Sequence, residues 1–230
     1  MSGNVKAALA GAVGGCVIAV PLLLTVTATA TAAHAGARAA KACRSGYAYA
    51  GIAGAGASRG AAATITPASL PTVRAGHVAA WVGVGGRGLG PRGTDVWLQA
   101  GLAAYPGRRV HLYYELMLPS GRRYVELGAP VSPGVRHRVA VHELPARPET
   151  WIVELDGRPA SDPIHLPGSH AAWPAVATAE NWTPAGQACN NRFAFRFESL
   201  RIDGGKQIRT VLTRPFRLVR TSAASFRAAA

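Results

Sequence analysis

The stretch "RFAFRFESLRI", residues 192–202, decides the fold class of this 230-residue chain. Phe193, Phe195 and Phe197 fall on one face of it, and the residues between them fall on the other. Alternation with a period of two is typical of a β-strand that buries one face, whereas the faces of a helix repeat about every 3.6 residues. The stretch therefore predicts a strand.

Similar short apolar runs, separated by glycine and proline, recur from residue 62 onward. We predict strands near residues 62–66, 76–84, 94–103, 109–118, 123–128, 136–144, 149–156, 173–182 and 192–202. Asp156 and Gly157 are typical of a hairpin turn, and one or two more strands are expected near the C-terminus. Many short strands and no sustained helical period after residue 36 predict an all-β, antiparallel sandwich or barrel.

The first 35 residues have the composition of a targeting segment. Lys6 is the only charged residue before Arg38, an apolar run follows it, and small residues end in Ala33-His34-Ala35. A charged start, an apolar middle and an A-x-A end are the parts of a secretory signal. Because the apolar run is about 20 residues long, a retained membrane-anchor helix is the alternative. Both predict a secreted or cell-surface protein, with membrane contact only if the leader is retained.

Two further segments are expected to contain little regular secondary structure. Residues 36–61 are rich in alanine and glycine and carry little apolar bulk, which predicts a loosely packed lead-in. The alanine-rich residues 221–230 are expected to form a tail. About 190 residues remain after the leader, enough for one domain with its own core. We expect a monomer.

The cysteines predict a disulfide. Cys43 and Cys189 remain once the leader, which holds Cys16, is set aside. An even pair in an exported chain predicts a bond between them, and two unpaired thiols are the alternative. The chain has no CxxC pair and no Cys/His spacing typical of zinc ligands. We therefore expect no metal and no other cofactor.

The formal net charge is +14 and comes almost entirely from arginine, because lysine occurs only at positions 6, 41 and 206. The basic residues come in twos and threes between the predicted strands, with no run of five. A nucleic-acid partner is typically met by a concentrated basic patch. The scattered pattern therefore argues against nucleic acid, whereas an anionic envelope polymer stays open.

The stretch "TDVWLQAGLAAY", residues 94–105, places an uncharged amide on a predicted strand. Gln99 shares a face with Trp97 and Gly101, opposite the apolar Val96 and Leu98. An amide can donate a hydrogen bond to a developing oxyanion and does not titrate. The alternative is an amide on a solvated face with no role in chemistry.

Glu180 is the only charged residue between positions 171 and 184. Strand alternation puts it on one face with Val176, Thr178 and Trp182. A carboxyl group in apolar surroundings next to a tryptophan is suited to general acid or base chemistry. A solvated strand face is again the alternative.

The remaining motifs predict no familiar enzyme class. The seven histidines form no HExxH motif, and no GxSxG elbow is present. The glycine-rich run at residues 81–93 lacks the GK[ST] ending of a phosphate loop and is expected to be a hairpin loop. Asn181-Trp182-Thr183 is a formal glycosylation acceptor.

In order, "HVAAWVGVGG", "TDVWLQAGL", "HLYYELMLPSG", "VAVHEL" and "AENW" resemble strands of the glutamic peptidase family, the eqolisins. The resemblance spans roughly residues 76–202 and looks closer to an exported bacterial branch than to the fungal enzymes. It implies a sandwich of two bent antiparallel sheets, concanavalin-like or jelly-roll-like, over residues 62–220. It also implies a glutamate that acts as general base on water and a glutamine that positions the water and stabilises the oxyanion.

By position, the resemblance implies that Gln99 and Glu180 are catalytic. The resemblance also places Trp81 near the cleft and Glu115 on the neighbouring strand, whereas strand parity puts Trp97 beside Gln99 and Trp182 beside Glu180. We predict that these four residues and Tyr113 bind the substrate. The family's late strand usually reads A-E-W-I-V-E, whereas here Asn181 intervenes and no second glutamate follows. The register of the Glu180 match is therefore open.

Three functions follow from these observations. An exported peptidase would use Gln99 and Glu180 to hydrolyse peptide bonds at acid pH. A non-catalytic, lectin-like module would bind glycan or cell-envelope polymer by stacking sugar rings on tryptophans. A polysaccharide hydrolase would need two carboxylates about 5–10 Å apart, and Glu115 and Glu180 are the available couple. We carry the peptidase forward, with peptide or polysaccharide as the expected ligand.

Overall fold

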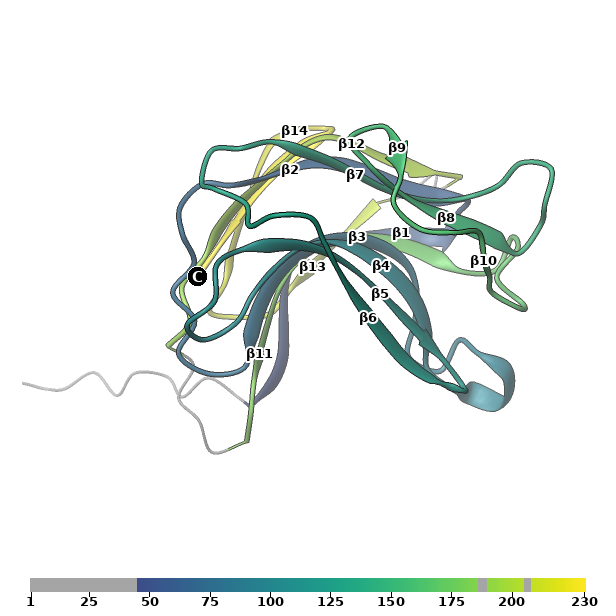
Figure 1. Cartoon of the computed structure of the whole chain (residues 1–230), viewed down its shortest axis with the longest axis horizontal. Helices are drawn as coiled ribbons and strands as arrows, with labels where there is room; N and C mark the ends of the chain where they lie inside the picture. The colour runs from purple at the N-terminus through teal and green to yellow at the C-terminus, as the bar shows by residue number, and fades with distance from the viewer. Residues whose placement is uncertain (1–44, 186–189, 205–207) are drawn as a thin grey trace, which may run out of the picture. The chain divides into compact units, whose positions relative to one another are not determined.

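The computed structural model describes residues 45–185, 190–204 and 208–230. These residues form two antiparallel β-sheets that pack face to face, as Figure 1 shows, and they include no α-helix. None of their segments is a helix long and apolar enough to cross a membrane. The predicted leader and both cysteines of the predicted disulfide, Cys43 and Cys189, lie outside the described residues.

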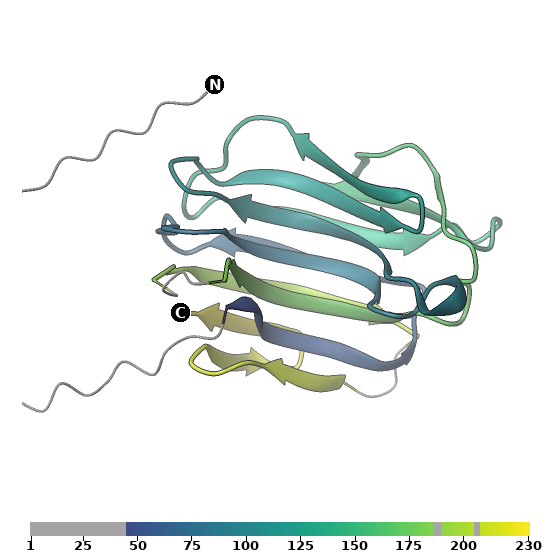
Figure 2. The ribbon, with the colours of Figure 1, turned by 90° about the horizontal axis from the view of Figure 1, so that it is seen from below.

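One sheet, here called the site sheet, has seven strands and is bent so that its hollow face turns away from the other sheet (Figure 1). Figure 2 shows its strands side by side from below. In order across the sheet they are β13 (Ile208–Leu212), β1 (Gly46–Ala57), β11 (Pro174–Thr183), β3 (His77–Gly86), β4 (Val96–Ala104), β5 (His111–Leu118) and β6 (Gly121–Leu127).

The other sheet, here called the backing sheet, covers the convex face of the site sheet. In order it contains β10 (Ile164–His165), β8 (Thr150–Leu155), β7 (His137–Glu143), β2 (Gly60–Pro67), β12 (Ala194–Asp203), β15 (Ser225–Ala229) and β14 (Arg217–Ser222), and β9 (Arg158–Pro159) pairs with β8. A 3₁₀ turn, Pro91–Gly93, lies in the loop between β3 and β4. The fold is therefore the predicted two-sheet antiparallel sandwich.

The core fills the space between the sheets because the strands alternate as predicted. Leu98 and Leu102 of β4 are fully buried there, as are Phe195 and Phe197 of β12. Phe197 stacks on Phe226 with ring centroids 4.3 Å apart. Since one face of each site-sheet strand is committed to this core, residues of opposite parity must emerge on the hollow face.

Nine predicted strands correspond to β2–β8, β11 and β12, with ends that differ by a few residues. The turn at Asp156 and Gly157 is also confirmed, with φ of 52° and 79° and with Leu155 opposite Arg158. Positive φ at both central residues is the conformation expected of a tight hairpin. The glycine-rich run joins β3 to β4, which pair as a hairpin.

Both predicted boundaries of the sandwich domain, residues 62 and 220, were wrong. Residues 46–57, expected in the lead-in, form β1 between β11 and β13. The strand is made of small residues because it packs closely: a Cβ at Gly51 would lie 2.3 Å from the carbonyl oxygen of Ala177. Residues 221–230, expected as a tail, contain β15, which pairs with β12 and buries Phe226.

Candidate functional site

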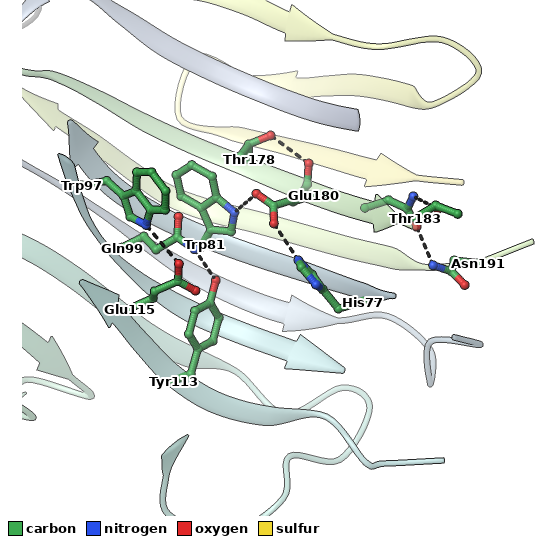
Figure 3. Close-up of polar contacts among 12 residues, drawn as sticks. His77, Trp81, Trp97, Gln99, Tyr113, Glu115, Thr178, Glu180, Thr183 and Asn191 are labelled. Carbon is green, nitrogen blue, oxygen red and sulfur yellow. Dashed lines mark hydrogen bonds and ion pairs between the residues drawn. The ribbon is translucent and has the colours of Figure 1, made fainter. Parts of the chain in front are cut away.

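A cavity of about 590 Å³ opens on the hollow face of the site sheet. Side chains from four strands meet there, as Figure 3 shows: Trp81 from β3, Gln99 from β4, Glu115 from β5 and Glu180 from β11. Trp97 of β4 lines it too. The structure thus brings both residues predicted to be catalytic, and three of the five predicted to bind substrate, to one cavity.

Glu180 is not on a solvated face, because only 5% of it is exposed. Its Oε1 lies 2.9 Å from Nε2 of His77. Its Oε2 accepts a hydrogen bond of 3.2 Å from the indole N–H of Trp81. Both oxygens of the carboxyl group are therefore engaged by side chains of β3.

Gln99 is also largely buried, with 9% of the residue exposed. Its Nε2 donates a hydrogen bond of 3.1 Å to the hydroxyl of Tyr113 on β5. Burial first, and then the negative charges of Glu180 and Glu115, raise the pKa of Tyr113 well above its usual value. The Tyr113 hydroxyl therefore stays neutral and holds the Gln99 amide from β5, on the same face of the sheet.

Glu115 is the direct cross-strand neighbour of Gln99. Its Oε1 accepts a hydrogen bond of 3.2 Å from the indole N–H of Trp97, and its Oε2 accepts one of 2.6 Å from Arg122. The side chain of Glu115 is 6% exposed. With both oxygens engaged, Glu115 fixes the indole and the guanidinium at the cavity wall.

Gln99 and Glu180 share the cavity but no hydrogen-bond partner. In the strand register Glu180 lies opposite Ala79 of β3, whereas Gln99 lies opposite Gly83, four residues along the same strand. With about 4.8 Å between strands and about 3.3 Å per residue, their Cα atoms would be about 16 Å apart on a flat sheet. Trp81 belongs to the intervening strand and donates to Glu180. Among the described residues, no hydrogen bond joins the Gln99 and Glu180 side chains.

The two acids are separated further. Glu115 lies on β5 and Glu180 on β11, three strands apart in the sheet and offset by four residues in register. The same flat-sheet spacing gives about 20 Å between their Cα atoms. A glycosidase is defined by the distance of about 5–10 Å between its carboxyl groups. Here each carboxyl group bonds to a different pair of side chains, Glu180 to His77 and Trp81 and Glu115 to Trp97 and Arg122, so the arrangement gives a polysaccharide hydrolase no support.

Aromatic rings support one end of the cavity. Tyr47 stacks on Tyr49 with centroids 6.1 Å apart, and Trp182 stacks on His77 at 5.6 Å. Tyr47, Tyr49 and His77 line the cavity, whereas Trp182 contacts it through His77 and Tyr47. Trp182 and Tyr113, both predicted to bind substrate, therefore hold lining residues in place.

The cavity carries charges of both signs. Arg122 is paired with Glu115, and Arg87 lies 3.8 Å from Asp95 at the exposed rim. Arg209 of β13 also lines the cavity. Within the described ranges, no group of three or more His, Cys, Asp or Glu side chains is placed to hold a metal ion.

Sequence reasoning did not identify several lining residues. His77 has the same strand parity as Trp81, so alternation along the predicted strand contained the signal for it. Tyr47 and Tyr49 alternate with alanine in a segment taken as a lead-in. Arg209 had no comparable signal, because its position depends on which strand lies next to β1.

The formal glycosylation acceptor is structural in the folded domain. Asn181 is 2% exposed and points away from the cavity side of β11. Its Nδ2 donates to Thr183 at 2.9 Å, and its Oδ1 accepts from Asn191 at 2.7 Å (Figure 3). Asn191 also accepts hydrogen bonds from the backbone N–H groups of Arg74 and Ala75. This network ties β11 to the segments before β3 and β12.

The fold is shared with glutamic peptidases of known structure. Scytalido-glutamic peptidase with a peptide-based transition state analog matches with a TM-score of 0.57 at 16% identity, over 80% of this chain and 98% of that chain. SCP-B, a member of the eqolisin family of peptidases in a complex with the tripeptide Ala-Ile-His, matches with a TM-score of 0.54 at 15% identity, over 79% and 96%. The sequence itself matches no protein-family model and no curated protein. At these identities the likeness shows the fold alone.

Proposed function

We propose that this protein binds an extended peptide segment in the cavity on the hollow face of the site sheet. The observation that carries the proposal is the cavity of about 590 Å³, in which Trp81 and Trp97 are combined with the polar ends of Gln99 and Glu180. Apolar and aromatic walls with a few placed polar groups are typical of ligand sites. The similar solved structures hold a peptide-based analog and a tripeptide, which supports a peptide as the ligand.

The charges and rings of the cavity suit such a ligand. Trp81 and Trp97 are each held by a carboxylate at their N–H, which leaves their ring faces available for apolar side chains. Arg209 offers a cation for a carboxylate of the ligand. Preorganised rings lose little conformational entropy on binding, which favours affinity.

Peptide binding can be tested with a synthetic unstructured peptide of about eight residues, using isothermal titration calorimetry and tryptophan fluorescence. We expect Trp81→Ala and Trp97→Ala to weaken binding at least tenfold. Val219→Ala, which changes an exposed residue on β14 of the backing sheet, should leave it unchanged. Wild-type protein that ignores peptides and is retained by cell-envelope glycan would replace this proposal with the lectin-like function.

Hydrolysis of the bound peptide is the second candidate function. It is favoured by one observation, that Gln99 and Glu180 line the same cavity. Glu180 would take a proton from water as the water attacks the peptide carbonyl, and the Gln99 amide would donate to the oxyanion. Collapse of this intermediate would break the C–N bond, and the proton held by Glu180 would pass to the leaving amine. For one water to serve both, Gln99 would turn from Tyr113 and Glu180 from His77.

Acid-pH cleavage of an unfolded protein substrate tests this second candidate. Cleavage by wild type that is lost in Glu180→Gln would support hydrolysis by Glu180. If wild type and Glu180→Gln are equally inert while peptide still binds, hydrolysis through Glu180 is excluded and the binding function stands.

A further inference from the structure

A second cavity, of about 860 Å³, shares no lining residue with the cavity on the hollow face. Its walls come from the segments before β3, β12 and β14 and from the strands β14 and β15. Its volume lies in the range of about 300–1,000 Å³ that is usual for ligand sites. Here called the arginine cavity, it is lined among others by Thr72, Arg74, Asn191, Arg192, Phe216 and Arg217.

The backbone at each of the three arginines is held by contacts that do not use the guanidinium groups. Arg192 exchanges two backbone hydrogen bonds with Thr72, of 2.8 and 2.9 Å. The N–H of Arg74 donates to Oδ1 of Asn191 at 2.8 Å, and Arg217 lies in β14, which pairs with β15. A guanidinium group carries five N–H donors, so these side chains can offer their donors to a ligand.

No acidic side chain neutralises the arginine cavity. All eleven Asp and Glu residues of the chain lie in the described ranges, and none of them forms an ion pair with Arg74, Arg192 or Arg217. Ala230 lines the cavity too, and within the described ranges no ion pair joins its carboxyl group to these arginines. The cavity therefore gathers three positive charges, which favours an anion as its ligand.

The positive surface continues over the outer face of the backing sheet. The phenylalanines of β12 face the core, so Arg196 emerges on the outer face, where it lies directly opposite Arg227 of β15. Glu198, on the same face of β12, pairs with Arg136 instead. Like charges directly opposite each other destabilise a sheet, and a bound anion would remove that repulsion. Ala229, two residues beyond Arg227 on the same face, lines the cavity.

We propose that the arginine cavity is a second binding site, which takes an extended polyanion whose charges are phosphate groups. Arg74, Arg192 and Arg217 would contact it in the cavity, and the pair Arg196 and Arg227 would continue the contact for a longer chain. Guanidinium groups bind phosphate oxygens through paired, charge-assisted hydrogen bonds and stay charged at every physiological pH. A single phosphate ion would fill only part of the cavity and would not reach the pair on the outer face.

The arginine cavity lacks what a nucleic-acid site adds to phosphate contacts. Sites for single-stranded nucleic acid combine basic groups with aromatic rings on which the bases stack. Of the lining residues, all of which lie in the described ranges, only Phe216 is aromatic. Its ring is buried and packs edge to face on Phe193, with ring centroids 5.2 Å apart. The ligand proposed here is therefore a phosphate chain without bases.

The site is tested by titrating wild-type protein with linear polyphosphate of about 15 units in a calorimeter, at about 0.15 M salt, where charges more than about 8 Å apart are screened. The double variant Arg192→Gln with Arg217→Gln should bind about tenfold more weakly or worse, because two charge-assisted contacts are lost. The matched control is Arg147→Gln with Arg158→Gln. It removes two exposed arginines, between β7 and β8 and on β9, at the same cost in net charge, and it should bind like wild type.

Equal weakening in the two double variants would reduce the effect to net charge and overturn the site. Inorganic phosphate that binds as tightly as the chain would overturn an extended ligand. Tighter binding of a thymidine oligonucleotide, or of polyglutamate of the same charge, would assign the cavity to nucleic acid or to a carboxylate polymer instead. Circular dichroism checks that each variant is folded.

The proposal is independent of peptide binding on the hollow face. Trp81→Ala, which should weaken peptide binding, lies in the other cavity and should leave the affinity for polyphosphate unchanged. The variant Arg192→Gln with Arg217→Gln should in turn bind peptide as wild type does. Failure of wild type to bind peptide would therefore leave the arginine cavity intact, and failure to bind polyphosphate would leave the peptide site intact.

Discussion

Nε2 of His77 lies 2.9 Å from Oε1 of Glu180, and this contact links β3 to β11 above the backbone ladder. Trp81, four residues further along β3, donates to the other oxygen of the same carboxyl group. One buried acid thus orients an imidazole and an indole at the cavity wall. The first role of Glu180 is therefore to hold aromatic groups in place, which a stability measurement can detect.

Glu180→Ala should lower the free energy of unfolding by about 1–3 kcal/mol, because it leaves buried polar groups of His77 and Trp81 without an acceptor. Glu180→Gln keeps one acceptor oxygen and should cost less. Urea denaturation followed by fluorescence measures both. Glu154→Ala, which removes the acid of a looser pair with His142 at 3.8 Å on the backing sheet, is the matched control. Equal losses at positions 180 and 154 would contradict the anchoring role.

Asn191→Ala should also lower the free energy of unfolding by about 1–3 kcal/mol. The side chain accepts from the backbone of Arg74 and Ala75 and donates to Asn181 and to the carbonyl oxygen of Ala75, and all of these lose a partner. Thermal or urea unfolding measures the loss. The exposed neighbour Asn190→Ala should change stability little, and a similar loss there would count against the network.

Gly101→Ala should destabilise the site sheet by roughly 1–3 kcal/mol, the usual cost of overpacking. An added Cβ would lie 2.0 Å from the carbonyl oxygen of Ala80 and 2.6 Å from the Cα of Trp81. Strand β3 must therefore shift, and with it the Trp81 indole, which tryptophan fluorescence reports. At Gly56 a Cβ meets nothing within 4 Å, so Gly56→Ala should be nearly neutral, and a comparable loss at both positions would refute the close approach.

Stability should fall as the pH rises above about 10, the usual pKa of tyrosine. Burial, together with nearby charge from Glu180, raises the pKa of both Tyr113 and Tyr49 in the folded protein. Each then binds a proton that the unfolded chain has released, so each can contribute up to about 1.4 kcal/mol of loss per pH unit until its folded pKa is reached. Below pH 10 this contribution to stability is fully present.

Tyr113→Phe and Tyr49→Phe should therefore each flatten the alkaline slope of the unfolding free energy. The measurement is urea denaturation at several pH values between 8 and 11. Tyr113→Phe also removes the acceptor of the Gln99 amide, which lowers stability at every pH but does not alter the slope. Slopes identical to wild type in both variants would show that these hydroxyls ionise equally in the folded and unfolded chain.

Which side chains share a face of a strand followed from the sequence alone. Alternation put Phe193, Phe195 and Phe197 on one face of a strand, and the structure buries all three in the core. It also put Gln99 and Trp97 on one face of their strand, and both line the cavity. The reason is local, because within a strand the face depends only on whether positions are odd or even. The same parity rule grouped Glu180 with Thr178, and the structure places both on the cavity side of β11.

Which residues lie opposite one another was decided only by the tertiary structure. A shift of four residues along β11 leaves parity unchanged, yet it moves a side chain by about 13 Å along the strand. The sequence could not show which residue of β11 pairs with which residue of β3, because register between strands distant in the chain depends on how whole sheets pack. The Ala/Gly-rich β1 was not predicted as a strand for a related reason. It is held in the sheet by its pairing with β11 and β13, and its sequence contains few of the bulky residues that indicate a strand.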